Sequence, residues 1–289
     1  MKKICLFLLF LLVFAVPQNV YANMAAPQKA DIGSSITFEQ NDALSVISEV
    51  LDITVHGSKA DINAAYRMKN TTEEAVATAA MFLSPNIEES GAQVIINGQA
   101  VPFAKKSYAL SYDTEIKAED WQYAVLTNDR TVGRDDQRVD AVSFEMDFAP
   151  NEEYEVVVSY TYQLGGYPEL DFNAKYGRID YYLAPAAMWK EFGGLTINLN
   201  LDEDMPVISK SNLEFKKVGP RTYQYVSNTL PAENLQISID ENWYQNIFST
   251  LRSPYLKMTI FMFLPFILIG LAVVILIVWV LYRRKKKRP

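Results

Sequence analysis

The chain has 289 residues, of which 49% are hydrophobic and 21% charged, and its formal net charge is −7. One histidine and one cysteine argue against a zinc site and against a hydrolase triad built on histidine or a thiol. All 34 acidic residues lie between residues 23 and 255, together with 18 of the 27 basic residues. That segment therefore has a net charge of −16. An acidic segment repels nucleic acid, and nucleic-acid binding is therefore not expected.

Residues 1–22 have the composition of a secretory signal peptide. Lys2 and Lys3 precede the apolar run Ile4–Val16, and Ala22 provides a small residue before the expected cleavage site. The apolar run is too short to cross a bilayer as a helix. An uncleaved N-terminal anchor is the alternative. The only cysteine lies in this segment, and a mature exported domain without cysteine is typical of bacterial cell-surface proteins.

Between residues 23 and 240 the strongest pattern is an alternation of apolar and polar residues, as in strands with one buried face. In Val139–Phe148, for example, Val142, Phe144 and Met146 alternate with polar residues. The predicted strands are Glu49–Val55, Asp61–Asn70, Ala75–Leu83, Gln93–Ile96, Gln99–Phe103, Val139–Phe148, Tyr154–Tyr162, Leu195–Leu201, Tyr223–Val226 and Leu235–Ile239. They predict a mainly β fold, an antiparallel β-sandwich that is either one large unit or two in tandem.

Three short links between these strands predict β-hairpins. Asn97-Gly98 is a two-residue turn of the kind that needs φ > 0 at both positions. Ala149–Glu152 and Asn70–Thr72 are rich in turn residues, so the strands on either side of each link are expected to pair. Asn70-Thr71-Thr72 is also an N-glycosylation sequon, although in a bacterial protein a turn is the simpler interpretation.

The segment 107–138 interrupts the strand pattern and is the expected place for an internal boundary or an insertion. Within it, Trp121 and Val125 are spaced i, i+4 after two acidic residues, which is typical of a short helix over 117–126. An irregular loop that buries Trp121 is the alternative.

Residues 241–257 connect the β-rich segment to a long apolar run and carry aromatic side chains at helical spacing. Trp243, Tyr244, Phe248 and Tyr255 are expected at a membrane–water interface, because amphipathic aromatic rings favour the headgroup level. They predict a short interfacial helix that keeps the preceding domain close to the bilayer. The alternative is a last strand whose tryptophan packs in the core.

Residues 258–282 contain no charged side chain and are long enough to form a transmembrane helix. At a rise of 1.5 Å, about 25 residues reach about 37 Å, which exceeds a hydrocarbon core of about 30 Å. The tail 283–289 begins with Arg283 and Arg284, the first of six consecutive cations. Cytoplasmic flanks of membrane helices are enriched in Lys and Arg, so we expect a single pass through the cell membrane with the tail in the cytoplasm and residues 23–240 outside.

Few residues of the β-rich segment form a pattern typical of catalysis. His56 follows a predicted strand and precedes Gly57-Ser58, so it is interpreted as a turn residue. The acidic clusters are Glu88-Glu89, Asp135-Asp136 and Asp202-Glu203-Asp204. Solvated turns explain all three, and the last is the preferred candidate if calcium is bound. Aromatic residues, a proline and two glycines in Tyr181–Leu195 predict a packed corner, with a sugar-stacking platform as the alternative.

Two resemblances rest on the first strands. The strand Asp61–Asn70, followed by one that closes at Phe82-Leu83-Ser84-Pro85, resembles exported bacterial proteins of uncharacterised families with a β-rich domain on a C-terminal single-pass anchor. Residues 51–103, where an Asn-Gly hairpin follows a similar strand pair, resemble the vault and inter-alpha-trypsin type of N-terminal domain. Both resemblances imply fold class and topology, and neither implies catalytic residues.

The sequence therefore predicts a membrane-anchored binding or envelope-organising module outside the cytoplasm, not an enzyme, with no cofactor and no metal. Its expected partners are the membrane and an envelope protein or wall component. The alternative is a carboxylate-dependent glycan hydrolase, which needs two carboxylates at a set separation in a concave site.

Overall fold

The computed structural model describes residues 24–25, 35–36, 38, 40–85, 87, 91–110, 126–128, 138–170 and 173–286. The predicted signal peptide, the clusters Glu88-Glu89 and Asp135-Asp136, and residues 287–289 lie outside these ranges. Residues 117–125 of the predicted short helix also lie outside them, and Leu126, placed at its end, instead begins a strand.

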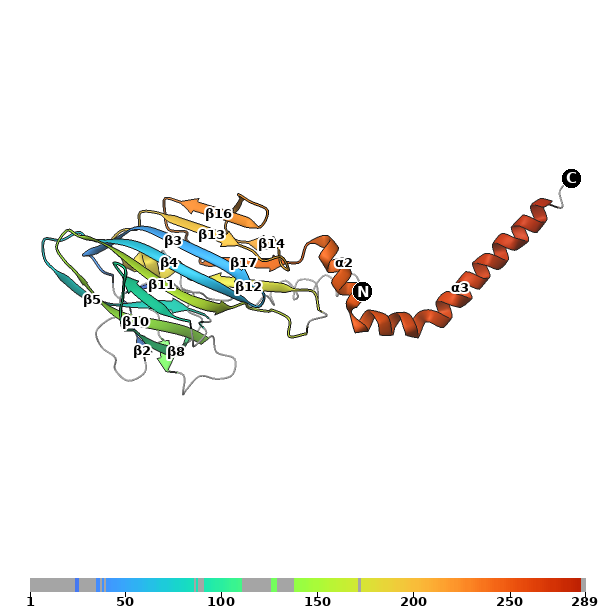
Figure 1. The fold of residues 1–289 in the computed structure, drawn as a ribbon, viewed down its shortest axis with the longest axis horizontal. Coiled ribbons are helices and arrows are strands. Elements are labelled where there is room, and N and C mark those ends of the chain that lie inside the picture. The colour runs from blue at the N-terminus through green and yellow to red at the C-terminus, as the bar shows by residue number, and fades with distance from the viewer. Residues whose placement is uncertain are drawn as a thin grey trace, which may run out of the picture.

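Within the described residues the domain is a β-sandwich of two large sheets, with a third, smaller sheet at one end (Figure 1). The larger sheet has the strand order β15 (Lys216–Lys217), β16 (Thr222–Ser227), β13 (Leu195–Asn200), β3 (Leu44–His56), β4 (Lys59–Asn70), β11 (Glu153–Gln163), β6 (Gln93–Ile96) and β7 (Gln99–Ala100). The second has the order β1 (Met24–Ala25), β5 (Val76–Ser84), β10 (Arg138–Phe148), β8 (Ala104–Leu110), β9 (Leu126–Asn128) and β2 (Ser35–Ile36). The third consists of β12 (Tyr176–Tyr181), β17 (Leu235–Asp240) and β14 (Val207–Ser211). The predicted mainly β sandwich is confirmed.

The alternating pattern found in the sequence corresponds to alternating burial in the strands. Along β4, every second residue from Ala60 to Asn70 is buried and the residues between them are half-buried or exposed. β11 alternates in the same way from Val156 to Tyr162. Burial of each large apolar side chain contributes about 1.5–3 kcal/mol, so this periodicity determines which face of each strand packs inward.

Two of the three predicted hairpins are wrong. β10 pairs with β5 and β8, whereas β11 pairs with β4 and β6, so the link Ala149–Glu152 carries the chain from one large sheet to the other. β4 and β5 also lie in different sheets and are joined across the sandwich through Asn70–Thr72. The Asn97-Gly98 turn is confirmed: it joins the paired strands β6 and β7, and both residues have positive φ.

The buried side chain of Asn70 holds these two sheet-crossing links together. Its Nδ2 donates to the carbonyl oxygens of Glu74 at 2.8 Å and Ala149 at 3.0 Å, and its Oδ1 accepts from the Thr72 N–H at 2.9 Å. Asn70 has no exposed surface, so the asparagine of the sequon stabilises the corner where the chain passes between the sheets. A pattern of turn residues is the same for a hairpin and for a corner between sheets, which is why the sequence predicted hairpins.

The larger sheet contains one parallel pair, formed by β3 and β13, among otherwise antiparallel neighbours. Leu195 lies opposite Glu49 and Asn200 opposite Thr54, so residues about 150 positions apart in the chain lie side by side. A parallel pair requires a crossover connection, and here it contains β4 to β12. The predicted antiparallel sandwich is therefore correct for all but this pair of the larger sheet.

The interior is continuous across the three sheets. One hydrophobic cluster contains Leu51, Ile53 and Tyr66 of the larger sheet, Phe82, Phe144 and Met146 of the second, and Ile179, Leu235 and Ile237 of the third. A smaller cluster packs Met81, Leu83 and Ala141 against Tyr182, Ala184 and Met188, around the 3-10 helix η2 (Ala184–Met188). Strand β8 ends and strand β10 begins on either side of most of segment 107–138. These two strands pair with each other in the second sheet.

Candidate functional site

The candidate functional site is the end of the domain where the third sheet leads into two C-terminal helices (Figure 1). β17 ends at Asp240, and α2 (Trp243–Arg252) and α3 (Pro254–Lys286) follow. A capping box begins α2: Asn242 Oδ1 accepts from the Gln245 N–H at 3.1 Å and Gln245 Oε1 accepts from the Asn242 N–H at 3.0 Å. Ser253, extended before a proline, separates the two helices.

One side of α2 is hydrogen-bonded to the β-domain. Gln245 Nε2 donates to the Glu203 carbonyl oxygen at 2.7 Å. Ser249 is only 4% exposed, and its hydroxyl lies 2.7 Å from both oxygens of the Glu241 carboxylate. Glu241 is held in turn by Lys175, whose N–H donates to Glu241 Oε1 at 3.1 Å. These contacts involve both the first and second turns of α2, so the helix is attached along its length.

The other side of α2 presents large apolar side chains to solvent. The exposed residues are Trp243 (76%), Tyr244, Ile247, Phe248 (60%) and Leu251. At about 100° per residue, Ile247 points to the side of the helix opposite Gln245 and Ser249. A helix on a soluble domain normally turns its apolar face to the core, so the orientation of α2 is the reverse of the usual one.

The predicted membrane-interface residues fall into two groups. Trp243, Tyr244 and Phe248 lie on α2, and Tyr255 lies exposed in the first turn of α3. Because Trp243 begins a helix and is exposed, the alternative of a last strand with a core tryptophan is wrong. Arg283 and Arg284 lie in the last turn of α3. The assignment of both groups to membrane surfaces remains a prediction.

The C-terminal helix α3 is long and apolar enough to cross a membrane. Its segment Pro254–Val280 has 27 residues and contains an 18-residue stretch with a mean hydropathy of 3.1, none of which is buried against the domain. Pro265 lies inside the helix, where it removes one backbone donor, and Figure 1 shows a bend in the first half of α3. At the far end, the Arg283 guanidinium lies 4.1 Å from the centre of the Trp279 ring.

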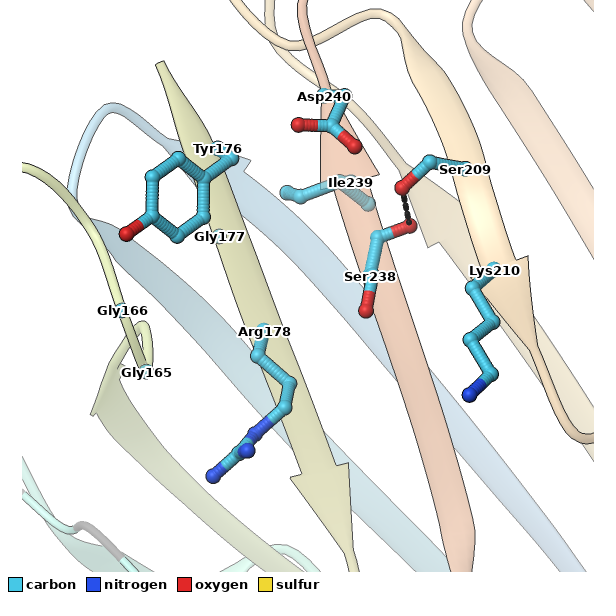
Figure 2. A pocket seen from close by; sticks show the side chains of 10 residues that line it. All are labelled: Gly165, Gly166, Tyr176, Gly177, Arg178, Ser209, Lys210, Ser238, Ile239 and Asp240. Carbon is cyan, nitrogen blue, oxygen red and sulfur yellow. Dashed lines mark hydrogen bonds between the residues drawn. The ribbon is translucent and has the colours of Figure 1, made fainter. Parts of the chain in front are cut away.

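A groove of about 550 Å³ lies on the third sheet, beside the point where β17 leads into α2. Three strands and one loop contribute to it, and Figure 2 shows how their side chains lie. The lining residues are Gly165, Gly166, Tyr176, Gly177, Arg178, Ser209, Lys210, Ser238, Ile239 and Asp240. Sequence reasoning missed this groove, because β12 and β14 carry too little alternation to be recognised as strands.

Charged residues divide the groove into two ends. Figure 2 shows Tyr176 and Asp240 at one end and Arg178 and Lys210 at the other. The strand register explains this arrangement, because Tyr176 lies opposite Asp240, whereas Arg178 and Lys210 both lie opposite Ser238 from the two sides of β17. The groove therefore combines a cationic end with an acidic, aromatic end.

The preferred calcium candidate, Asp202-Glu203-Asp204, is a hydrogen-bonded turn. Asp202 Oδ2 accepts from the Gly57 N–H at 2.7 Å, and its Oδ1 accepts from the Met205 N–H at 2.9 Å. Asp204 forms an ion pair with Lys175, and Glu203 pairs with Arg221 at 3.3 Å. Within the described residues, no three His, Cys, Asp or Glu side chains are grouped so that they could hold a metal ion.

The segment Tyr181–Leu195 forms the packed corner that the sequence predicts. Tyr181, Tyr182 and Trp189 are buried, so the alternative of an exposed sugar-stacking platform is wrong. His56 ends β3 next to the Gly57-Ser58 turn, with an exposed side chain 3.5 Å from Asp61. It is therefore the last strand residue before the turn and not, as the sequence predicts, a residue of the turn itself.

A buried carboxyl group lies between the sheets and was missed from the sequence. Glu49 has no exposed surface, and its Oε1 accepts from the Tyr181 hydroxyl at 2.8 Å. The Tyr181 and Tyr66 hydroxyls are 2.9 Å apart, which extends the hydrogen-bonded chain. The sequence contained a signal for this burial. Leu51 and Ile53 face inward, and Glu49 lies two residues before Leu51, so the alternation along β3 places it on the same inward face.

Burial determines the ionisation of the phenols around Glu49. It raises the pKa of both Tyr66 and Tyr181 well above the ordinary value, and the nearby Glu49 raises each further. Burial also raises the pKa of Tyr160 and Tyr162 on β11. These phenols are therefore neutral at physiological pH.

No protein-family model matches the chain, and no curated protein matches its sequence significantly. Among solved structures, a putative nutrient binding protein from Legionella pneumophila is 14% identical, with a TM-score of 0.49 over 80% of this chain and 78% of that chain. An M1 zinc metallopeptidase from Deinococcus radiodurans is 10% identical, with a TM-score of 0.32 over 70% of this chain and 43% of that chain.

Yeast LTA4 hydrolase in complex with bestatin is 9% identical, with a TM-score of 0.34 over 74% of this chain and 31% of that chain. This chain thus matches less than half the length of the metallopeptidase and the hydrolase. With every one of these TM-scores below 0.5, the likenesses carry no argument about activity, ligand or partner.

Proposed function

We propose that this chain is a single-pass protein of the bacterial cell membrane whose β-sandwich domain binds a component of the envelope outside the cytoplasm. In this proposal α3 crosses the bilayer, the basic tail is cytoplasmic and α2 lies along the outer surface. The domain is then held against the bilayer in one orientation and does not move freely on a linker.

The observation that carries the proposal is the two-sided character of α2. Its Gln245 and Ser249 side is hydrogen-bonded to the domain, while Trp243, Ile247 and Phe248 are exposed. Each apolar side chain of this size gains about 1.5–3 kcal/mol when it leaves water, so a nearby bilayer is a favourable environment for this face. Aromatic residues beside a membrane-spanning helix are typical of the headgroup region.

Charge supports the same orientation. The segment 23–255 has a net charge of −16, and the end of the chain carries six consecutive cations. Cations that flank a membrane helix favour the cytoplasmic side, whereas acidic residues have little influence on orientation.

An acidic domain is also repelled by anionic headgroups within a Debye length of about 10 Å, so the apolar face of α2 is needed to hold the domain close.

The alternative, a glycan hydrolase, receives no support from the groove. Among the described residues, Asp240 is the single carboxylate that lines it, and the opposite end carries Arg178 and Lys210. Hydrolysis by a carboxylate pair needs a second acid across the bound sugar. We therefore propose a binding role for the domain.

Alkaline phosphatase fusions in a bacterial host test the orientation, because the enzyme is active only outside the cytoplasm. A fusion after Tyr255 is expected to be active, and a fusion after Pro289 is expected to be inactive. The reverse result contradicts the proposed topology.

Crosslinking of the full chain in intact cells tests the binding role. We expect an envelope component to be captured by the wild-type domain but not by a chain that carries only the signal, α2 and α3. Equal capture by both chains contradicts a binding role for the β-domain.

A further inference from the structure

The groove on the third sheet lies close to the helix that we propose to rest on the bilayer. Asp240, which lines the groove, is two residues before the N-cap Asn242 of α2. Ser238 lies two residues further back along β17, at about 3.4 Å per residue. The part of the groove on β17 thus lies within four residues, or about 14 Å along the chain, of the N-cap of α2.

The cationic end has the chemistry of a phosphate site. Arg178 Nε donates to the Oδ2 of buried Asp180 at 2.7 Å, which orients the guanidinium while its side chain stays partly exposed. Lys210 is exposed on the neighbouring side of β17, and the Ser238 residue lies between the two cations in the strand register. Two cations and a hydroxyl group supply several charge-assisted donors to one oxyanion.

The other end has the chemistry of an ammonium site. Asp240 offers a carboxylate, and the ring of Tyr176, which is 49% exposed, lies opposite it in the strand register. A carboxylate beside an aromatic face attracts a cation by both charge and the ring quadrupole. Figure 2 shows the two side chains at the same end of the groove.

Glycine keeps this end open. Gly166 has φ +71°, and a Cβ there would lie 3.0 Å from the ring of Tyr176. A Cβ on Gly177 would lie 2.8 Å from the Leu164 side chain. A side chain at Gly166 would displace the Tyr176 wall of the groove, whereas one at Gly177 would clash with the buried core beneath the groove.

We propose that the groove binds a zwitterion of the aminoethyl phosphate type. Its phosphate lies at Arg178, Ser238 and Lys210, and its ammonium lies at Asp240 and Tyr176. The two ends are separated by two residues of β17, about 7 Å. An α-amino acid carries both charges on one carbon and is too short to reach both ends, whereas an aminoethyl phosphate separates them by a two-carbon ester.

The ligand has two possible sources with the same chemistry, a phospholipid headgroup or a soluble or polymer-borne phosphodiester. The headgroup source rests on the proposed function, because lipid reaches the groove only if α2 lies at the bilayer. A soluble source does not depend on the orientation of the chain.

Calorimetric titration of the full chain in dodecyl maltoside micelles, which contain neither phosphate nor amine, tests the site. The probe is glycerophosphoethanolamine, and we expect saturable binding to one site. Lys210→Gln and Asp240→Asn are each expected to weaken binding about tenfold, since each removes one charge-assisted contact. Lys216→Gln and Asp147→Asn, exposed residues of the two large sheets, are the charge-matched controls and are expected to bind like the wild type.

Two simpler probes separate the ends of the groove. Binding of glycerol phosphate is expected to depend on Lys210 and not on Asp240, and binding of ethanolamine on Asp240 and not on Lys210. The absence of saturable binding to the wild type, or equal binding by both groove variants and their controls, overturns the proposal. If Lys210→Gln loses binding and Asp240→Asn does not, the proposal of a zwitterionic ligand is wrong, because the groove then recognises phosphate only.

Nanodiscs distinguish the two sources. If the headgroup is the ligand, phosphatidylethanolamine nanodiscs weaken the apparent affinity for the soluble probe more than phosphatidylglycerol nanodiscs do, because the phosphatidylglycerol headgroup has a phosphate for the cationic end but no amine for Asp240. Equal affinity in both nanodiscs assigns the ligand to solution. The micelle titration does not depend on topology. An unexpected result with the phosphatase fusions therefore contradicts the proposed orientation, whereas the absence of binding in micelles contradicts the proposed site.

Discussion

Two adjacent glycines at the crossing between β3 and β13 show how far single residues control this fold. Gly193 donates its N–H to the Val46 carbonyl oxygen at 2.9 Å, and a Cβ on Gly193 would lie 2.3 Å from the Ile47 carbonyl oxygen. The same atom on Gly194 would meet nothing closer than 3.5 Å. The backbone oxygen cannot move aside as a flexible side chain does, so only Gly193 is required by close approach.

Gly193→Ala is therefore expected to lower the free energy of unfolding by about 2 kcal/mol or more, because the parallel pairing must shift to relieve the clash. Gly194→Ala is the matched control and should change it by less than about 0.5 kcal/mol. Urea denaturation followed by near-UV circular dichroism measures both. Equal effects of the two substitutions contradict the packing argument.

The buried phenols predict how stability depends on pH. Tyr181 and Tyr66 have a raised pKa in the folded state, so their contribution to stability is complete below the unfolded pKa of about 10 and is lost as the pH rises above it. Each phenol costs up to about 1.4 kcal/mol of stability per pH unit in that range.

Tyr181→Phe removes one such group, so its free energy of unfolding should fall less steeply between pH 10 and 11.5 than that of the wild type. At pH 7 the same variant should be less stable by about 1–3 kcal/mol, because Glu49 loses a buried hydrogen bond. Tyr176→Phe, in which the ring is exposed, is the control and should follow the wild-type slope. Identical slopes in all three proteins contradict the assignment.

At the scale of elements, α2 differs from the strands in how it is held. The strands are fixed by ladders and by the core, whereas α2 is fixed to the domain through the side chains of Gln245 and Ser249. Its apolar side chains do not pack in the domain core. They are removed from water only when a second apolar environment covers the outer face of the helix.

Spin labels on single cysteines measure where that face lies in nanodiscs. A label at Phe248 should show the oxygen accessibility of the headgroup and upper acyl region, whereas a label at Lys217, on β15 of the larger sheet, should behave as in water. Asn246→Cys, on a different side of α2, should be less deeply placed than Phe248→Cys. Equal, water-like accessibility at all three sites contradicts the proposed docking of α2.

At the scale of the whole molecule, the three sheets share one hydrophobic cluster, and β3 near the start of the domain pairs with β13 near its end. Chain segments before and after segment 107–138 therefore depend on each other for burial. A continuous core links the stability of its parts, which is the physical basis of cooperative unfolding.

Thermal unfolding of the full chain in detergent should accordingly show one transition for the β-domain, with equal calorimetric and van't Hoff enthalpies. Two transitions, or a van't Hoff enthalpy well below the calorimetric one, would indicate two tandem domains. Gly193→Ala provides an internal check, since it should shift the whole transition and not one part of it.

Strand positions were largely predictable and strand partners were not. β6 matches its predicted range, and β10, β11 and β13 match theirs within one residue, because alternation is a local signal. The partner of β10 depends on which surface it buries against, and the link at Ala149–Glu152 suits a corner as well as a hairpin. The groove could not be predicted, because it requires Arg178, Lys210 and Asp240 from three strands to meet.

The sequence by itself determined the mainly β class, the apolar C-terminal helix and the aromatic spacing of α2, because each depends on the order and periodicity of nearby residues. Only the tertiary structure decided that β4 and β5 lie in different sheets, as do β10 and β11, that Glu49 is buried against Tyr181, and that α2 turns its apolar side outward. These features depend on contacts between residues far apart in the chain, and the free energy of such contacts is set by the whole packed core.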